Sequence, residues 1–252
     1  MTWLRSATFN VWFFGVTFLL LLMSLPLRAV APQRAMSLVR LWSRLVLAGL
    51  RVLCGIRWQV SGLDRVPRGG ALIASQHQSA FDTMIWFLLV PDPSYVLKRE
   101  LLRIPLFGGM CRVTGMIAID RDGGASALRE LVRAGGRAAA EGRQIVIFPE
   151  GTRVEPGRHA VLQPGIAALA ARTGLPVLPV ATDSGRCWGR RAFRKRAGTI
   201  HIAILPPLAP GLPRPALLGA LLDSYSTDPA TVTRPVDNSV GAIGGRLPSR
   251  AN

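Results

Sequence analysis

The stretch Gln144-Ile-Val-Ile-Phe148 is a short apolar run that follows a helical pattern at residues 125–141 and precedes another at residues 165–172. Runs of the same kind occur at residues 71–75, 95–97, 116–119, 177–181 and 199–204, and a further helical pattern spans residues 81–89. Short strands that alternate with helices are typical of α/β proteins. The sequence therefore predicts an α/β fold in which helices flank a mixed, mostly parallel sheet.

Residues 7–27 form an apolar segment without a charged side chain. As a helix, these 21 residues would extend about 32 Å, which is enough to cross a hydrocarbon core of about 30 Å. A signal peptide is the alternative, because Ala29-Val30-Ala31 resembles a cleavage site. The apolar run is longer than the usual hydrophobic region of a signal peptide, which favours a membrane-anchoring helix.

Residues 36–57 form a helical pattern of a different kind. Arg40, Arg44 and Arg51 fall on one face of a 3.6-residue helix, and apolar side chains occupy much of the rest. A helix with an arginine stripe and a broad apolar surface is typical of the headgroup region of a membrane. An ordinary surface helix of the globular domain is the alternative.

The arginines also orient the chain. Six of them lie within residues 28–57, against Arg5 alone before the apolar run. Because positive residues favour the cytoplasmic side, we expect the cell (inner) membrane, with the following domain on its cytoplasmic face. A shallow hairpin in one leaflet satisfies the same facts. The predicted organisation is an anchor with an interfacial helix over 1–57, a globular domain over 58–222 and a disordered tail over 223–252.

The chain of 252 residues carries a formal net charge of +17 at pH 7. Such a surface attracts polyanions, which include nucleic acid, anionic lipid and acidic small substrates. Only Lys98 and Lys195 among the 31 basic residues are lysines. A GC-rich codon bias explains the choice of arginine but not the shortage of acidic residues.

The three cysteines and three histidines are too scattered for a disulfide framework, a zinc ribbon or a paired-histidine metal site. They are Cys54, Cys111, Cys187, His77, His159 and His201. We therefore expect no metal and a reduced, cytosolic setting for the domain.

His77 comes directly after the predicted strand at residues 71–75, and Asp82 follows five residues later. At a strand end an imidazole can meet a substrate, while a carboxylate in the next turn holds its other ring nitrogen. Ser79 lies between them but lacks the sharp turn of an activated serine, so we expect the substrate to supply the reacting hydroxyl. The alternative is a polar turn in which Asp82 caps a helix.

A second cluster, Phe148-Pro-Glu-Gly-Thr-Arg153, follows the strand quoted first. Gly151 permits close approach of a ligand, Thr152 offers a hydroxyl, and Arg153 presents a fork suited to phosphate. Glu150 can accept a hydrogen bond from a glycerol hydroxyl or from Arg153. Two further cations, Lys98 and Arg99, follow the strand at residues 95–97.

These motifs carry a resemblance. His77-Gln-Ser-Ala-Phe-Asp82 and Phe148-Pro-Glu-Gly-Thr-Arg153 resemble two sequence blocks of the glycerolipid acyltransferases, in the same order and at a similar spacing. Residues 98–108 are similar to an intermediate block of that family and residues 177–181 to its last block. The resemblance covers roughly residues 60–210. The two main blocks together are highly specific, and within the family the chain looks most like the enzymes that acylate 1-acylglycerol 3-phosphate.

The resemblance implies direct acyl transfer without an acyl-enzyme. His77 would deprotonate the sn-2 hydroxyl of lysophosphatidic acid, and Asp82 would orient His77. The residues implied in substrate binding are Glu150, Gly151, Thr152, Arg153, Lys98 and Arg99. The donor would be acyl-CoA or acyl carrier protein, the product would be phosphatidic acid for phospholipid synthesis, and no cofactor would be required.

Several features leave alternatives open. The family's usual lysine is replaced by Gln163, for which Arg158 could substitute, and the chain beyond about residue 215 does not resemble the family's closing helix. The acceptor could instead be glycerol 3-phosphate or another lysolipid.

Residues 186–196 hold six basic side chains with Trp188 and Phe193 between them. Together with the apolar N-terminus they favour anionic lipid, CoA phosphates or an acidic carrier protein over nucleic acid. A non-catalytic, membrane-tethered polyanion-binding protein is the alternative of another class.

Overall fold

The computed structural model describes residues 1–158, 161–232 and 235–236. Its strands are β1 (Ile56–Ser61), β2 (Ala71–Ser75), β3 (Pro93–Lys98), β4 (Ile117–Ile119), β5 (Gln144–Ile147), β6 (Val177–Thr182), β7 (Gly198–Ile204) and β8 (Pro235–Val236). They form one sheet in the order β4-β3-β5-β2-β6-β7-β1-β8. Neighbouring strands are parallel except β6 with β7 and β1 with β8. The predicted α/β fold with a mixed, mostly parallel sheet is confirmed.

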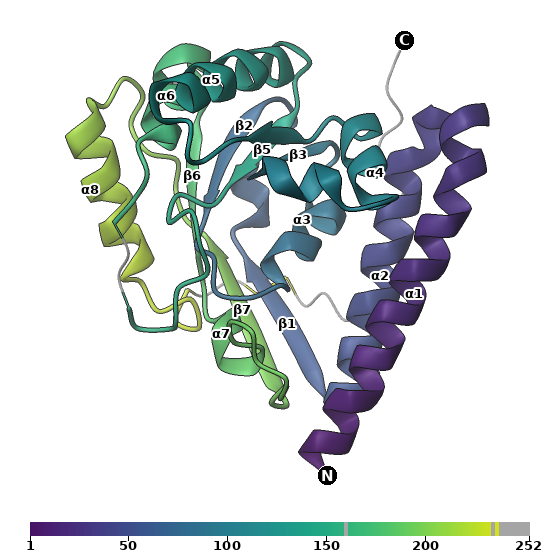
Figure 1. The fold of residues 1–252 in the computed structure, drawn as a ribbon. Coiled ribbons are helices and arrows are strands. Elements are labelled where there is room, and N and C mark those ends of the chain that lie inside the picture. The colour runs from purple at the N-terminus through teal and green to yellow at the C-terminus, as the bar shows by residue number, and fades with distance from the viewer. Residues whose placement is uncertain (159–160, 233–234, 237–252) are drawn as a thin grey trace.

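Helices cover both faces of the sheet (Figure 1). The α-helices are α1 (Thr2–Val30), α2 (Ala35–Cys54), α3 (Asp82–Leu89), α4 (Phe107–Val113), α5 (Gly124–Ala140), α6 (Gly165–Thr173), α7 (Ser184–Cys187) and α8 (Arg214–Tyr225). Short 3-10 turns are η1 (Pro32–Arg34), η2 (Leu63–Arg65) and η3 (Arg99–Arg103). One hydrophobic core joins the sheet to α1, α2 and α3, and a second joins it to α5, α6 and α8.

Strand β2 explains how the site is positioned. All five of its residues are buried, and its side chains enter the two cores alternately. A strand with both faces covered is expected to be a continuous apolar run, as Ala71-Leu-Ile-Ala-Ser75 is. The turn that carries His77 follows the carboxyl end of β2, which is where ligands bind in open α/β sheets.

Helix α2 ends earlier than the helical pattern over residues 36–57 predicts. Gly55 adopts a left-handed conformation (φ 69°) and closes the helix, so that β1 begins at Ile56. The arginines of the predicted stripe also differ in their surroundings: Arg44 is exposed, whereas Arg40 is half-buried. Arg40 turns toward the domain and donates hydrogen bonds to the backbone carbonyls of Phe87 and Pro91. This face of α2 therefore belongs to the domain, as in the alternative interpretation of a surface helix.

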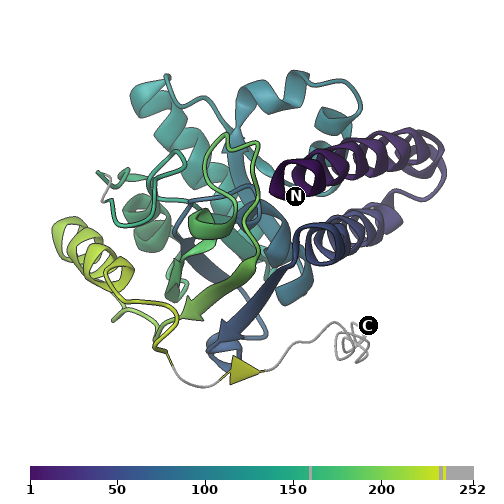
Figure 2. The ribbon, with the colours of Figure 1, turned by 90° about the horizontal axis from the view of Figure 1, so that it is seen from below.

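Helix α1 is long and apolar enough to cross a membrane by length and composition. It lies beside α2 in both views (Figures 1 and 2) and is tied to it along its length. Three side-chain bonds, Arg5 Nε to Leu53 O (2.8 Å), Trp12 Nε1 to Leu45 O (3.0 Å) and Trp42 Nε1 to Thr17 Oγ1 (2.9 Å), join the two helices. Helix α1 is thus packed against α2, and its Phe9 joins the hydrophobic core that contains the sheet.

Helix α8 is absent from the sequence-based assignment. Pro215 lies in its first turn, where proline is tolerated, and Leu217 and Leu221 are buried against the sheet. At its end the Tyr225 hydroxyl donates to the carbonyl of Ala74 in β2 (3.1 Å). The chain therefore has a closing helix that its sequence did not reveal. Most of the predicted tail over 223–252 lies outside the described residues.

Candidate active site

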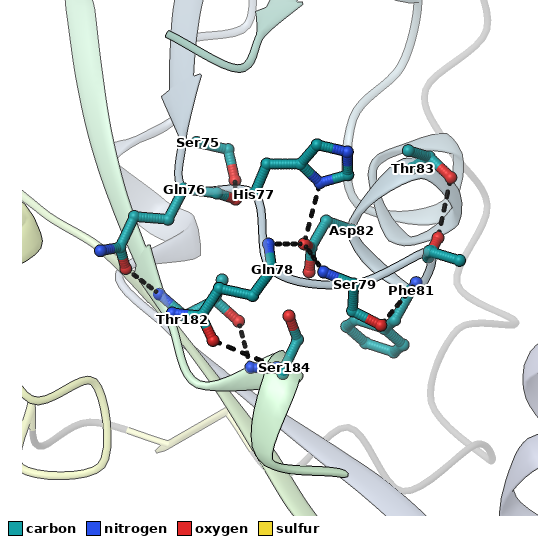
Figure 3. A network of polar contacts seen from close by, with 12 residues as sticks. Ser75, Gln76, His77, Gln78, Ser79, Phe81, Asp82, Thr83, Thr182 and Ser184 are labelled. Carbon is teal, nitrogen blue, oxygen red and sulfur yellow. Dashed lines mark hydrogen bonds and ion pairs between the residues drawn. The ribbon is translucent and has the colours of Figure 1, made fainter. Parts of the chain in front are cut away.

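His77 and Asp82 meet in the turn between β2 and α3 (Figure 3). His77 Nδ1 lies 3.2 Å from Asp82 Oδ2, and the same oxygen accepts the backbone N–H groups of Gln78 and Ser79 at 2.8 Å each. The Asp82 side chain is 3 % exposed and that of His77 is 12 % exposed. The chain between the two residues therefore builds the contact that their spacing predicts.

This geometry sets which ring nitrogen is free. A carboxylate accepts only, so the Asp82 contact assigns the proton to Nδ1 and leaves the Nε2 lone pair available. The imidazole also stacks on Phe148, with ring centroids 4.1 Å apart and planes inclined by 20°. In Figure 3 the second nitrogen points away from Asp82. His77 is thus held on two sides and presents a base.

Two glutamines fix the same turn from behind (Figure 3). Gln76 Oε1 accepts from the Thr182 N–H (3.0 Å), and its amide nitrogen donates to the carbonyl of Tyr225 (3.1 Å). Gln78 Oε1 accepts from the Gly185 N–H (3.1 Å). These bonds tie the catalytic turn to β6, α7 and α8. Sequence analysis did not single out either glutamine, because their partners are more than a hundred residues away.

Glu150 lies beneath His77. Its Oε1 accepts the His77 backbone N–H (3.1 Å), while Oε2 is buried without a partner among the described residues. Burial raises the pKa of this carboxyl to about 7, although the hydrogen bonds it accepts from backbone N–H groups oppose the shift. Glu150 does not line the neighbouring cavity. Glu150 therefore contacts the turn that carries His77, and its contact with substrate stays a prediction.

His77 opens onto a cavity of about 530 Å³. Its cationic wall contains Lys98, Arg121, Arg153, Arg190 and Arg191. Gly151 and Thr152 lie on the same wall, as the sequence predicts for a phosphate-binding segment. Its apolar wall includes Leu20 and Leu21 of α1, Val39 and Trp42 of α2, and Phe107 and Met110 of α4. The cavity can therefore accept an anionic group and a hydrocarbon chain together.

The cations of this wall are partly desolvated. Burial lowers the pKa of the Arg153 guanidinium, an effect that Asp82 opposes and Arg190 increases. Burial likewise lowers the pKa of Arg121, against the influence of Glu100. Both guanidinium groups remain charged at neutral pH because arginine starts from so high a value. An incoming phosphate would pair with charges that water screens only in part.

Arg121, Arg190 and Arg191 were missed as site residues. Arg121 lies two residues after β4, at the same edge of the sheet as His77, and donates to the Gly151 carbonyl. Its position after the carboxyl end of a strand could have identified Arg121 from the sequence, because ligands bind there in open α/β sheets. Arg190 and Arg191 reach the cavity only through the tertiary fold, although the basic stretch that contains them was noted.

Two other predicted cations lie elsewhere. Arg99 pairs with Glu130 of α5 and does not line the cavity. Arg158 is exposed, pairs with Glu155 (3.3 Å) and does not replace the cation missing at Gln163 in the cavity wall. Among the described residues no group of three or more histidine, cysteine, aspartate or glutamate side chains could hold a metal ion.

The chain resembles known acyltransferases in sequence. A family model described as Acyltransferase matches residues 57–183. The 1-acyl-sn-glycerol-3-phosphate acyltransferase of Pseudomonas aeruginosa is 38 % identical over 205 residues, covering 81 % of this chain and 77 % of the relative. The mouse 1-acyl-sn-glycerol-3-phosphate acyltransferase alpha is 28 % identical over 245 residues, or 96 % of this chain and 83 % of the relative.

A solved structure extends the likeness to the fold. The crystal structure of the 1-acyl-sn-glycerophosphate acyltransferase PlsC from Thermotoga maritima superposes with a TM-score of 0.71 at 20 % identity. The match covers 89 % of this chain and 95 % of that one, so the two chains share a fold. With the motifs, the His77–Asp82 geometry and the sequence matches, these findings show that the chain belongs to the acyltransferase family.

Proposed function

We propose that this acyltransferase moves a fatty acyl group from acyl-CoA or acyl carrier protein to the sn-2 hydroxyl of 1-acylglycerol 3-phosphate, giving phosphatidic acid. One observation carries the proposal: the His77–Asp82 pair opens onto a cavity with a cationic wall and an apolar wall. A lysophosphatidic acid has a phosphate and a hydrocarbon chain on either side of its free hydroxyl. The names of the bacterial and mouse relatives specify the same acceptor.

The chemistry follows from the free nitrogen of His77. The sn-2 hydroxyl transfers its proton to Nε2 as its oxygen attacks the thioester carbonyl, and Asp82 stabilises the imidazolium that forms. The tetrahedral intermediate then expels the thiolate, and the imidazolium returns the proton to that sulfur. An ester bond forms, a thioester bond breaks, and His77 ends as a neutral base.

The cavity favours direct attack over an acyl-enzyme. Cys111 is the thiol in its wall, and burial raises the pKa of that thiol to about 11, so it stays protonated and weakly nucleophilic at neutral pH. The Thr83 hydroxyl donates to the carbonyl of Ala80 in the turn before α3, and the Thr114 hydroxyl donates to the carbonyl of Met110 in α4. Ser79 is fully buried, and its Oγ accepts the Phe81 N–H. These contacts favour the substrate hydroxyl as the nucleophile.

Acceptor binding is assigned to the cationic wall. Arg153 and Lys98 would hold the phosphate, because both lie on the cavity together with His77 and combine delocalised and point charges. Gly151 has φ 69°, a left-handed conformation that favours glycine and leaves this wall free of a side chain. The apolar wall from α1, α2 and α4 would hold an acyl chain.

Membrane attachment is assigned to α1 and α2. Phe14, Phe18, Leu19 and Met23 are exposed on α1, whereas its opposite side packs on α2 and the domain. A helix bound to the domain along its length is better suited to lie in one leaflet than to span the bilayer alone. We therefore place the protein on the cytoplasmic face of the cell membrane, where α1 walls a cavity that a lysolipid can enter from the lipid.

The test is an acceptor and donor panel on the purified full chain in mixed micelles. Lysophosphatidic acid, glycerol 3-phosphate and neutral lysolipids are compared with acyl-CoA and acyl carrier protein as donors. We expect lysophosphatidic acid to give the highest kcat/KM, with formation of phosphatidic acid. A higher kcat/KM with glycerol 3-phosphate or a neutral lysolipid would overturn the assigned acceptor.

A further inference from the structure

Residues 186–196, named here the basic segment, hold a cluster of exposed arginines. They are Arg186, Arg190, Arg191, Arg194 and Arg196. None of the five forms an ion pair among the described residues, unlike Arg99 and Arg143 elsewhere in the chain. Like charges gathered without acidic partners repel one another, so the segment is suited to an external anion.

Lys195 attaches the basic segment to α1. Its backbone N–H donates to Ser6 Oγ (2.9 Å), and its ammonium group bonds to Asn10 Oδ1 and the Phe193 carbonyl (3.0 Å). Three rings surround that ammonium group at centroid distances of 5.4, 5.2 and 5.6 Å: Phe9, Trp188 and Phe193. A compact ammonium fits such a closed aromatic site better than a guanidinium. The segment and α1 therefore form one surface.

The tip of the basic segment is aromatic as well as cationic. Phe193 stacks on Trp3 with ring centroids 5.0 Å apart, and the two residues are 42 % and 59 % exposed. The Arg194 guanidinium carbon lies 5.7 Å from the Trp3 ring centroid. Exposed aromatic rings beside arginines are typical of the interface between lipid and water. Figure 2 shows the loop before β7 beside the start of α1, whose exposed apolar side chains continue the surface.

The same segment reaches the active site. Arg190 and Arg191 line the cavity that contains His77. Arg191 has a positive φ (53°), which is uncommon for a residue other than glycine and is held here by a short turn closed by Ala192 N–H to Gly189 O (3.1 Å). The edge that joins α1 to the basic segment is therefore also an edge of the cavity.

We propose that the basic segment is a second membrane contact, which binds anionic phospholipid headgroups beside α1 and holds the cavity at the headgroup layer. The inference rests on the proposed function only in that α1 enters a membrane. An acidic carrier protein would match the charge, but it would not need an exposed Phe193–Trp3 pair continuous with the apolar side of α1. The charge and the apolar surface together favour the lipid.

The first experiment locates the segment. Arg194→Cys, and as a control Arg133→Cys on α5 across the sheet, are labelled with one fluorophore in the full chain; the three native cysteines are buried. The protein is bound to vesicles of phosphatidylcholine and phosphatidylglycerol that contain a nitroxide-headgroup lipid. We expect quenching several-fold stronger at position 194 than at position 133. Equal quenching would overturn the proposal, whether or not the protein acylates lysophosphatidic acid.

The second experiment tests the charges. The triple variant Arg186→Gln, Arg194→Gln and Arg196→Gln is compared with Arg129→Gln, Arg133→Gln and Arg137→Gln on α5, which removes the same charge elsewhere. Transfer of the full chain between vesicles should become about tenfold faster for the segment variant on phosphatidylglycerol vesicles, and stay unchanged on phosphatidylcholine. An equal acceleration in the α5 variant would show a general charge effect and overturn the proposal. Unchanged transfer with a raised KM for acyl carrier protein would reassign the segment to the donor.

Discussion

The chain contains two histidine–aspartate pairs with nearly the same contact. His77 Nδ1 lies 3.2 Å from Asp82 Oδ2, and His201 Nδ1 lies 3.0 Å from Asp183 Oδ2. In both pairs the carboxylate is buried and also accepts backbone N–H groups. His201 is the more exposed of the two histidines, with 26 % of its side chain accessible. By the distance between the two side chains alone, the pairs would be judged equivalent.

Their surroundings separate them. His77 stacks on Phe148 and lines a cavity with five cations, whereas His201 lies on a strand and does not line that cavity. Asp183 and His201 connect β6 and β7 across their antiparallel edge. A histidine–aspartate hydrogen bond can therefore serve structure or catalysis. The difference lies in whether the second nitrogen faces a place where an acceptor hydroxyl and its phosphate can be held.

The comparison is tested most strongly by removing each histidine. His77→Ala should lower acyl transfer by about 10³-fold, because a general base contributes about 10²–10⁴-fold. His201→Ala should keep most of the activity. The measurement is the initial rate of phosphatidic acid formation, with circular dichroism as the control for folding. A His77→Ala enzyme that retained a tenth of the activity would end the assignment of the base.

The carboxylates sharpen the comparison further. Asp82→Asn should reduce kcat by about 10²-fold, because the amide no longer fixes the proton on Nδ1 of His77. Asp183→Asn should instead lower the free energy of unfolding by about 1–2 kcal/mol through its weakened bonds to His201, with little change in kcat. Turnover and thermal denaturation of both variants measure the two effects. The reverse pattern would show that the catalytic role belongs to Asp183 and His201 instead of Asp82 and His77.

The cationic wall provides the next test. Arg153→Ala should raise the KM for lysophosphatidic acid by about 10–150-fold and that for the thioester donor much less, because a charge-assisted bond to phosphate is worth about 1.5–3 kcal/mol. Arg158→Ala is the matched control, since that arginine is exposed and outside the cavity. Steady-state kinetics with each substrate varied in turn decide the matter. Equal increases in both KM values would mean that Arg153 shapes the site instead of binding phosphate.

Glu150, the buried carboxyl beneath the His77 turn, should make the stability of the protein depend on pH. Its carboxyl pKa of about 7, against an ordinary 4.5, means that the folded state holds the proton more tightly. Stability should therefore fall as the pH rises from about 4.5 to about 7, by up to about 3 kcal/mol. Glu150→Gln keeps an oxygen for the His77 N–H and should be the more stable protein above pH 7.

Thermal denaturation of the Glu150→Gln variant across this pH range measures the effect. The exposed Glu155→Gln is the control and should leave the pH dependence unchanged. If wild type and Glu150→Gln lose stability in parallel, the Glu150 carboxyl is not the group that titrates.

Much of the sheet was predictable because its strands are buried on both faces and are continuous apolar runs. Strand β1 was missed, since Arg57 and Gln59 are exposed and only Gly55 separates the strand from α2. Helix α8 was missed because the sequence beyond about residue 215 does not resemble the family's closing helix; Pro215 fits the first turn of the helix, where proline is tolerated. Both errors concern edges of the fold, where side chains meet water and the apolar pattern is weaker.

The residues of the candidate site were also predictable only in part from the sequence. The structure brings together His77, Asp82 and Arg153, which the sequence singled out because each follows a buried strand within a few residues. Their roles in the reaction stay predictions. It did not separate Lys98, which lines the cavity, from Arg99, which turns to Glu130. Lys98 is the last residue of β3 and Arg99 is the first of η3, so the chain turns between them, and the sequence does not show which of the two side chains meets the cavity.

The wall that α1 contributes to the cavity has a kinetic consequence. Leu20 and Leu21 line the place where an acyl chain would lie, so under the proposed function the acyl chain of the acceptor would pass from the bilayer to the protein without crossing water. The rate should then follow the mole fraction of lysophosphatidic acid in the bilayer and not its amount per volume of solution. Added inert lipid would slow the enzyme by two-dimensional dilution even at constant bulk concentration, and crowding of the leaflet by product would regulate it as effectively as any dissolved inhibitor.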